Sequence, residues 1–224
     1  MRKRKMSFNV AIDGPAGAGK STIAKQVAKQ MNFIYVDTGA MYRAMGLYMV
    51  RKGISGEDAA ALEAACQEVD ITIEYQNGEQ QVILNGENVN GFIRTEEAGK
   101  MASAVAKNGK VREKLVDLQK KLAQTADVIM DGRDIGTCVL PNADVKIYLT
   151  ASVEERARRR HKELVEKGVE CNIEEIKADI IARDEQDMNR EISPLKQADD
   201  AILLDASDMT IQEVTDEIIR ICKK

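Results

Sequence analysis

Apolar residues gather in five short runs along the chain, and each run has the length of a β-strand. The runs are "FNVAID" (8–13), "FIYVD" (33–37), "DVIMD" (127–131), "VKIYL" (145–149) and "AILLD" (201–205). Most are almost continuously apolar, which is typical of strands covered on both faces. Helical patterns lie between them, so the alternation predicts an α/β fold with a parallel five-stranded sheet flanked by helices.

One segment departs from this pattern. Apolar and polar residues alternate along "ITIEYQNGEQQVILNGENV" (71–89), which contains the dipeptides Asn77-Gly78 and Asn85-Gly86. Such dipeptides favour tight hairpin turns, because both central residues of these turns need a positive φ angle. The segment therefore predicts a small antiparallel insertion on the parallel core.

Two helices show their starting points in the sequence. Ser152 with Glu155, and Thr210 with Glu213, have the spacing of a capping box. In that motif the first side chain binds the backbone N–H of the second residue, whose side chain binds back. We expect a helix to begin at each pair.

Composition limits the possible functions. The 224 residues carry a formal net charge of -4, so no overall basic field draws the chain to nucleic acid. Its four cysteines are far apart and form no C-x-x-C pair, which argues against zinc and disulfides and favours a cytoplasmic location. No apolar run reaches the roughly 20 residues that cross a bilayer. The basic start "MRKRK" lacks the features of a cleaved signal, and we expect a solvated tail there.

The strongest candidate for chemistry follows the first predicted strand. The stretch Gly14-x-x-x-x-Gly19-Lys20-Ser21 precedes an amphipathic helical run, which is the context of a phosphate-binding loop. Its glycines let backbone N–H groups surround an anion, the helix start favours negative charge, and Lys20 addresses the β and γ phosphates. An ordinary glycine-rich turn is the alternative. The predicted ATP-binding residues are Gly14, Pro15, Ala16, Gly17, Ala18, Gly19, Lys20, Ser21 and Thr22.

A magnesium ion is expected beside this loop. The hydroxyl of Ser21 is a candidate ligand, and Asp131, at the end of its strand, would hold the ion through water. A strand-end Asp that caps the next turn is the alternative for Asp131.

Arginines after several strands suggest a second phosphate. They stand in "DTGAMYR", "DGRDIGT" and "RDEQDMNR", where the carboxyl ends of parallel strands converge. Guanidinium groups neutralise and orient a phosphate brought next to ATP. A surface salt bridge remains the alternative for each. These residues are Arg43, Arg133, Arg183 and Arg190.

A further group of arginines lies in "SVEERARRRHKEL". Arg156, Arg159 and Arg160 share one helical face and could close over the transferring phosphates as a lid. The alternative is a solvated face paired with neighbouring glutamates. A stripe for RNA is disfavoured, since aromatic residues make up only 4% and none lies among these arginines.

Together these motifs resemble the bacterial cytidylate kinases, nucleoside monophosphate kinases that transfer the γ-phosphate of ATP to CMP or dCMP. The resemblance runs from about Phe8 to the C-terminal helix and rests on "IDGPAGAGKST", "DTGAMYR", "GFIRT", "DGRDIGT", "VKIYLTAS" with "EERARRR", and "RDEQDMNREISPL". It implies one kinase domain over 1–224, with a core (7–37, 102–150, 170–224), a monophosphate-binding insertion (38–101) and a helical lid (151–169).

The resemblance also implies roles for individual residues. Arg43, Arg133 and Arg190 would hold the acceptor phosphate, with Thr38 nearby; Asp187 and Arg183 would bind the ribose; Ser103, Arg112 and Asp134 would bind the base. A carboxylate at Asp134 could accept from the N4 amino group of cytosine, whereas uracil has an oxygen there. A helix N-cap, or an ion pair with Arg133, is the alternative for Asp134.

Phosphoryl transfer of this kind needs positioning and charge neutralisation rather than a nucleophilic side chain. The expected catalytic residues are Lys20, Arg133, Arg156 and Arg160, with ATP as donor, Mg²⁺ as cofactor and CMP or dCMP as acceptor. We expect a monomer that closes over its substrates. The alternatives are another small phosphate-loop kinase, acting on UMP or shikimate, or a GTPase-like switch, although the N-K-x-D motif of such switches is absent.

Overall fold

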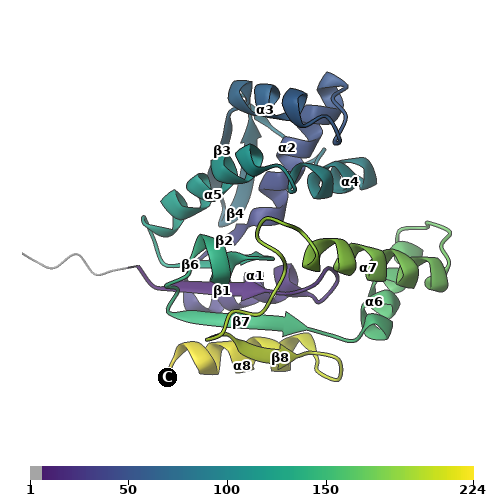
Figure 1. Ribbon diagram of the computed structural model, residues 1–224. Coiled ribbons are helices and arrows are strands. Elements are labelled where there is room, and N and C mark those ends of the chain that lie inside the picture. Colours follow the sequence, from purple (N-terminus) through teal and green to yellow (C-terminus); the bar gives the residue numbers. More distant parts are fainter. Residues whose placement is uncertain (1–6) are drawn as a thin grey trace, which may run out of the picture. The chain divides into compact units, whose positions relative to one another are not determined.

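The computed structural model describes residues 7–224 and confirms the α/β prediction (Figure 1). Five strands form a parallel sheet in the order β2-β6-β1-β7-β8. Their bounds are Asn9–Asp13 (β1), Ile34–Asp37 (β2), Val128–Gly132 (β6), Val145–Thr150 (β7) and Ile202–Asp205 (β8). The basic start of the chain, for which a solvated tail is expected, lies outside the described residues.

The chain divides into two compact units. The first comprises Ser7 and Ile34–Val128, and the second comprises Phe8–Phe33 and Ile129–Lys224. No helix in residues 7–224 has both the length and the apolar character needed to span a membrane.

The second unit is built around β1 and β7. These strands are parallel, with Val10 opposite Val145 and Asp13 opposite Tyr148. Helix α1 (Lys20–Met31) packs on β1 and on α8 (Ile211–Cys222), which also contacts β7. Because β1 lies between β6 and β7 in the sheet, the loop after β1 leaves the sheet where the chain order changes direction, which is where α/β proteins bind ligands.

Strand β8 differs from the expectation for a strand covered on both faces. It is the last strand of the sheet and pairs only with β7. Ile202 and Leu203 are 46% and 56% exposed. An edge strand has a neighbour on one side only, so an apolar sequence does not by itself ensure that the strand is covered.

Two further helices lie beyond β7 in the second unit. Helix α6 (Val153–Glu166) packs against α7 (Ile173–Met188) through a small cluster of Ala157, Ile176 and Ile180 (Figure 1). A short π-helix, η1 (Ile135–Val139), follows β6 and contacts β1. A π-helix is uncommon and is frequently found at functional sites.

The predicted capping motifs are present in part. Thr210 and Glu213 form a complete capping box at the start of α8. Ser152 accepts a hydrogen bond from the N–H of Glu155 at the start of α6. The carboxylate of Glu155 does not complete that second box, because it binds Arg158 and Arg159 instead.

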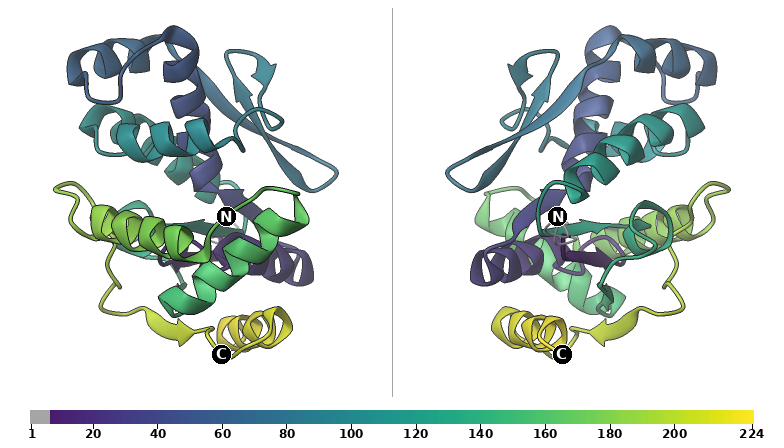
Figure 2. Two further views of the ribbon diagram at one scale, coloured as in Figure 1. Left: turned by 90° about the vertical axis from the view of Figure 1, so that its right-hand side faces the viewer. Right: turned by 90° about the vertical axis from the view of Figure 1, so that its left-hand side faces the viewer.

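The first unit contains the predicted antiparallel insertion. Strands β3 (Ile71–Gln76) and β4 (Glu79–Leu84) pair antiparallel, and β5 (Glu87–Asn88) extends this small sheet. The hairpin forms a long twisted ribbon beside α2 (Thr38–Lys52) (Figure 2). Asn77, Gly78, Asn85 and Gly86 all have positive φ angles, which confirms the prediction made from the two Asn-Gly pairs.

Buried helices complete the first unit. Met41, Met45 and Met49 of α2 are fully buried. Gly46 lets α4 (Glu96–Val105) come close, because a Cβ atom there would lie 2.9 Å from the backbone nitrogen of Ala102. Helix α3 (Ala59–Glu68) packs on α5 (Gly109–Ala123), which also contacts α2. The close approach at Gly46 holds α2 and α4 against each other.

Candidate active site

The loop between β1 and α1 has the backbone shape of a phosphate-binding loop. Gly14, Gly17 and Gly19 have φ angles of 146°, 76° and 88°. A Cβ atom on Gly14 would lie 1.9 Å from the carbonyl oxygen of Leu149 on β7, so only glycine fits there. Gly19 occupies the N-cap position of α1 and supplies no side-chain cap. The first N–H groups of α1 therefore suit an anion such as phosphate.

Lys20 is buried at the base of this loop. Its ammonium group donates hydrogen bonds to the carbonyl oxygens of Gly14 and Pro15, both at 2.7 Å. Burial and the nearby charge of Arg133 lower the pKa of Lys20 to about 7, while the charges of Asp131 and Asp13 oppose this shift. A bound polyphosphate would favour the charged ammonium, as required of a residue that addresses β and γ phosphates.

Ser21 and Asp131 lie side by side, as the sequence predicts for a magnesium site. The hydroxyl of Ser21 donates a hydrogen bond to Asp131 Oδ2 at 2.8 Å. Asp131 is buried at the end of β6. A hydroxyl and a carboxylate are the oxygen ligands that Mg²⁺ prefers, so the pair fits the ion.

Three arginines predicted to bind the acceptor lie near Asp187. Arg133 Nε lies 2.8 Å from Asp187 Oδ2, and Arg190 Nε donates to the carbonyl oxygen of Asp187 at 3.3 Å. Burial acts to raise the pKa of Asp187, but the charges of Arg133, Arg190 and Arg183 hold it below its ordinary value. Arg133 thus binds the carboxylate of Asp187, and the charges of Arg190 and Arg183 lie near it in the second unit.

The arginines of α6 are not equivalent. Arg156 is buried: its Nη1 donates to the carbonyl oxygen of Ala16 in the loop at 3.0 Å, and its Nη2 lies 2.6 Å from Asp184 Oδ2. Arg159 also lies close to the loop, since a Cβ atom on Gly19 would be 3.8 Å from its Nη1.

Arg160 instead pairs with Glu163 and has a half-exposed side chain. The structure thus brings two arginines of the predicted face to the loop and leaves Arg160 turned toward Glu163.

Asp134 occupies the N-cap position of η1, as the alternative interpretation allows. Its side chain makes no capping hydrogen bond, however, and the recorded ion pair of Arg133 is with Asp187. Asp134 is 5% exposed. The carboxylate of Asp134 is therefore buried close to the end of β6.

The remaining predicted residues belong to the first unit. Thr38 begins α2 and is buried, and Ser103 lies on α4. Arg43 Nη1 donates to the carbonyl oxygens of Ile93 and Thr95, each at 3.3 Å.

Arg112 of α5 lies over the ring of Tyr42, with 6.0 Å between its guanidinium carbon and the ring centre. Tyr42 directly precedes Arg43 on α2. Arg112 therefore lies against α2, the helix that carries Arg43.

Comparisons with known proteins decide the family. A match to the cytidylate kinase family spans residues 10–224. The chain is 51% identical to the cytidylate kinase of Bacillus licheniformis, with 96% of each chain covered.

The chain belongs to the cytidylate kinase family.

Other members agree with this assignment. The chain is 46% identical to the cytidylate kinase of Halalkalibacterium halodurans, over 97% of this chain and 98% of the relative. It is 48% identical to that of Caldicellulosiruptor bescii, over 97% of this chain and 96% of the relative. A solved structure of an uncharacterized protein from Eubacterium ventriosum matches with a TM-score of 0.52 at 13% identity, over 97% and 99% of the two chains, which shows the fold alone.

Sequence reasoning missed several charged residues of this cytidylate kinase family member. Asp13 and Asp184 are buried partners of the predicted segments, and Arg94 binds Asp37 at 2.9 Å at the start of α2. Arg94 stands in "GFIRT", a motif of the resemblance, so that motif was the available signal. Asp13 and Asp184 also stand in motifs of the resemblance, but their partners Ile135 and Arg156 lie far away in the chain.

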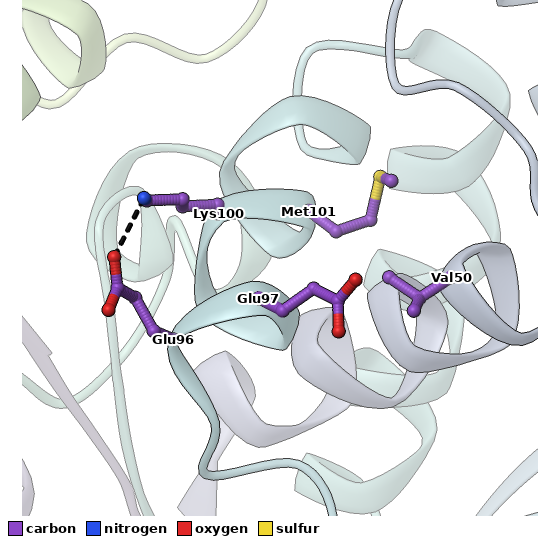
Figure 3. A pocket seen from close by; sticks show the side chains of 5 residues that line it. All are labelled: Val50, Glu96, Glu97, Lys100 and Met101. Atoms are coloured by element: carbon purple, nitrogen blue, oxygen red, sulfur yellow. Dashed lines mark ion pairs between the residues drawn. The ribbon is translucent and has the colours of Figure 1, made fainter.

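A hollow in the first unit is lined by none of the residues predicted to bind substrate. It lies between α2 and α4 and is lined by Val50, Glu96, Glu97, Lys100 and Met101 (Figure 3). Glu96 and Lys100 form an ion pair at 2.7 Å. With two carboxylates and one ammonium group, its lining does not attract a phosphate.

Proposed function

We propose that this protein is a kinase that transfers the γ-phosphoryl group of ATP to CMP and dCMP, giving ADP and CDP or dCDP. Membership of the cytidylate kinase family over nearly the whole chain supports the activity. The observation that carries the chemistry is the phosphate loop, with Lys20 at its base and Ser21 beside Asp131. We also propose a monomeric, cytoplasmic enzyme.

The donor half of the mechanism follows from the second unit. Backbone N–H groups of the loop and the start of α1 would hold the phosphates of ATP, and Lys20 would contact the transferred group. A Mg²⁺ ion held by Ser21, and through water by Asp131, would neutralise charge on the β and γ phosphates. No protein group has to be covalently modified.

The acceptor half needs positive charge and a base-reading group. Arg133 and Arg190, with Arg43, are the proposed contacts of the CMP phosphate, and Arg183 and Asp187 those of the ribose. Ser103, Arg112 and Asp134 are proposed for the base, and Thr38 lies at the start of the helix that carries Arg43.

Asp134 would accept a hydrogen bond from the N4 amino group of cytosine and disfavour uracil. Apart from Ser103 and Arg112, each of these residues stands in a motif of the resemblance.

Excluding water is the remaining requirement, since water competes with CMP for the phosphoryl group. We propose that the insertion (38–101) and the lid (151–169) close over the substrates before transfer. Arg156 and Arg160 are the lid residues proposed to stabilise the transferring phosphate.

Product analysis tests the proposal. The protein is incubated with ATP, Mg²⁺ and CMP, and all nucleotides are separated by ion-exchange chromatography. We expect ADP and CDP to appear in equal amounts, and Lys20→Ala to slow the formation of both by about 10²–10³. ADP without CDP would indicate a nucleotide hydrolase or switch and would refute the transfer reaction. Lys29→Ala is the matched control, because Lys29 lies near the other end of α1.

A further inference from the structure

Asp13 joins two parts of the candidate active site. It ends β1, directly before Gly14 of the phosphate loop, and is 4% exposed. Its Oδ1 accepts a hydrogen bond from the backbone N–H of Ile135 at 2.8 Å, and its Oδ2 accepts one from Gly136 at 2.7 Å. One carboxylate therefore connects the start of the phosphate loop to the first turn of η1.

These two hydrogen bonds satisfy the first N–H groups of η1, as a helix N-cap does. The first N–H groups of a helix have no partner within it, and the N-cap side chain commonly accepts from one of them. Asp134 stands at that position in η1, but its side chain does not cap. Asp13 caps the helix from a neighbouring strand. Bonds from N–H groups to an ionised carboxylate are shorter and stronger than those between neutral groups.

The space around this contact is closely filled. A Cβ atom on Gly136 would lie 3.3 Å from Asp13 Oδ2 and 3.2 Å from the Cδ atom of Lys146. The ammonium group of Lys146 is itself held by the carbonyl oxygen of Pro141 and by Asp200. A side chain at position 136 would therefore press on Asp13 and Lys146.

Hydrogen bonds from the backbone favour the ionised form of this carboxylate. Burial raises the pKa of Asp13 to about 6, and the charge of Asp134 acts in the same direction. The N–H groups of Gly136 and Ile135 and the charge of Lys20 limit this rise. Tyr148 lies opposite Asp13 on β7.

We propose that Asp13 is a positioning residue for acceptor recognition. By fixing the N–H groups of Ile135 and Gly136, it holds the backbone that directly follows Arg133 and Asp134. The side chains of Arg133 and Asp134 are then already oriented toward the phosphate and the base of the acceptor before it binds. This inference rests on the proposed function, in which Arg133 and Asp134 contact CMP.

The substitution Asp13→Asn tests the proposal with little change in size. Asparagine keeps one acceptor oxygen but places an NH₂ donor against the second N–H group. Asp144→Asn is the matched control, because Asp144 Oδ2 accepts from the backbone N–H of Asn9 at 2.7 Å at the other end of β1. Both variants remove one carboxylate that binds a backbone N–H group.

We expect Asp13→Asn to lower the ratio of kcat/KM for CMP over UMP about tenfold, since small errors of orientation are costly to catalysis. KM for CMP should rise more than KM for ATP. Asp144→Asn should leave the ratio within about twofold of the wild type, because it lies outside the contacted segment. An unchanged ratio in Asp13→Asn, or an equal fall in both variants, would overturn the positioning role.

A second measurement does not depend on the acceptor. Amide hydrogen exchange of Ile135 and Gly136, followed without nucleotide, should be at least about tenfold faster in Asp13→Asn than in the wild type. Unchanged exchange would refute the positioning role whichever nucleotide the enzyme prefers. A wild-type enzyme that does not prefer CMP would refute the proposed function alone, and the exchange result would still decide the role of Asp13 in the segment.

Gly136→Ala tests the same contact from the other side if Asp13→Asn does not fold. Its added methyl group would press on the Asp13 carboxylate, so the CMP over UMP ratio should fall in the same direction. Gly91→Ala is its control, because nothing lies within 4 Å of a Cβ atom there. An equal ratio in the two glycine variants would contradict the proposal.

Discussion

Breaking the ion pair between Arg156 and Asp184 should strongly destabilise the second unit. The side chains are only 4% and 11% exposed, and Arg156 Nη2 lies 2.6 Å from Asp184 Oδ2. Arg156 also donates to the carbonyl oxygens of Ala151 and Ala16, each at 3.0 Å. Asp184 Oδ1 is buried and has no hydrogen-bond partner within residues 7–224. The positive charge of Arg156 is therefore the main partner of the buried negative charge of Asp184.

The magnitude follows from this burial. Arg156→Met leaves the Asp184 charge buried without its partner, which typically costs about 3–5 kcal/mol of unfolding free energy. Asp184→Asn keeps both carbonyl contacts of Arg156 and should cost less, about 1.5–3 kcal/mol. Replacing both residues, by Met and Leu, removes the uncompensated charge, so the double variant should be more stable than Arg156→Met.

Urea unfolding followed by far-ultraviolet circular dichroism measures these differences. With a slope of about 2 kcal/mol per molar urea, Arg156→Met should unfold at a midpoint about 2 M lower than the wild type. Arg158→Met is the control, because Arg158 pairs with Glu155 at the surface, and its midpoint should stay close to the wild-type value. A double variant that is no more stable than Arg156→Met would refute the reasoning about buried charge.

Three further predictions concern the loop, the base and pH. Lys20→Ala should lower kcat by about 10²–10³. Its circular dichroism spectrum should stay unchanged, since the hydrogen bonds of Lys20 go to the loop carbonyls of Gly14 and Pro15. Near-normal turnover would remove Lys20 from the donor site. Asp134→Ala should lose about 1–3 kcal/mol of preference for CMP over UMP, measured as the ratio of kcat/KM, and an equal ratio would exclude it from base recognition. Burial raises the pKa of Asp13 from its ordinary value of 3.8 to about 6. Between these two pH values the folded protein binds more protons than the unfolded chain. The contribution of Asp13 to the free energy of unfolding therefore falls as pH rises through this range. Urea unfolding from pH 4 to pH 6 should show a decrease of up to about 3 kcal/mol relative to Asp13→Asn, and parallel profiles for the two proteins would contradict it.

Local patterns were sufficient to predict most of the fold. The five apolar runs became the five strands, with ends that differ by one residue or less, because a buried strand needs a continuous apolar sequence. The two Asn-Gly pairs became turns because their φ angles are a local property. Strand β8 was exposed more than its sequence suggests, since its position at the sheet edge depends on the whole topology.

Pairing of distant charged residues could not be predicted in the same way. The partners of Asp13 lie more than 120 residues away in the chain, at backbone N–H groups that carry no sequence signal. Arg156, Arg159 and Arg160 look alike in sequence, but only burial against α7 and the loop distinguishes Arg156. The phosphate loop was predictable because its glycines, Lys20 and flanking elements are adjacent in sequence.

An acceptor competition tests the central claim most directly. The wild-type enzyme receives ATP and Mg²⁺ with equal concentrations of CMP, dCMP, UMP, AMP and shikimate, and the products are quantified at low conversion. If the loop, Mg²⁺ and the arginines neutralise two phosphates and the Asp134 carboxylate contacts the base, CDP and dCDP should be the main products. Phosphorylated shikimate, UDP in excess of CDP, or ATP consumption with no phosphorylated acceptor would contradict it.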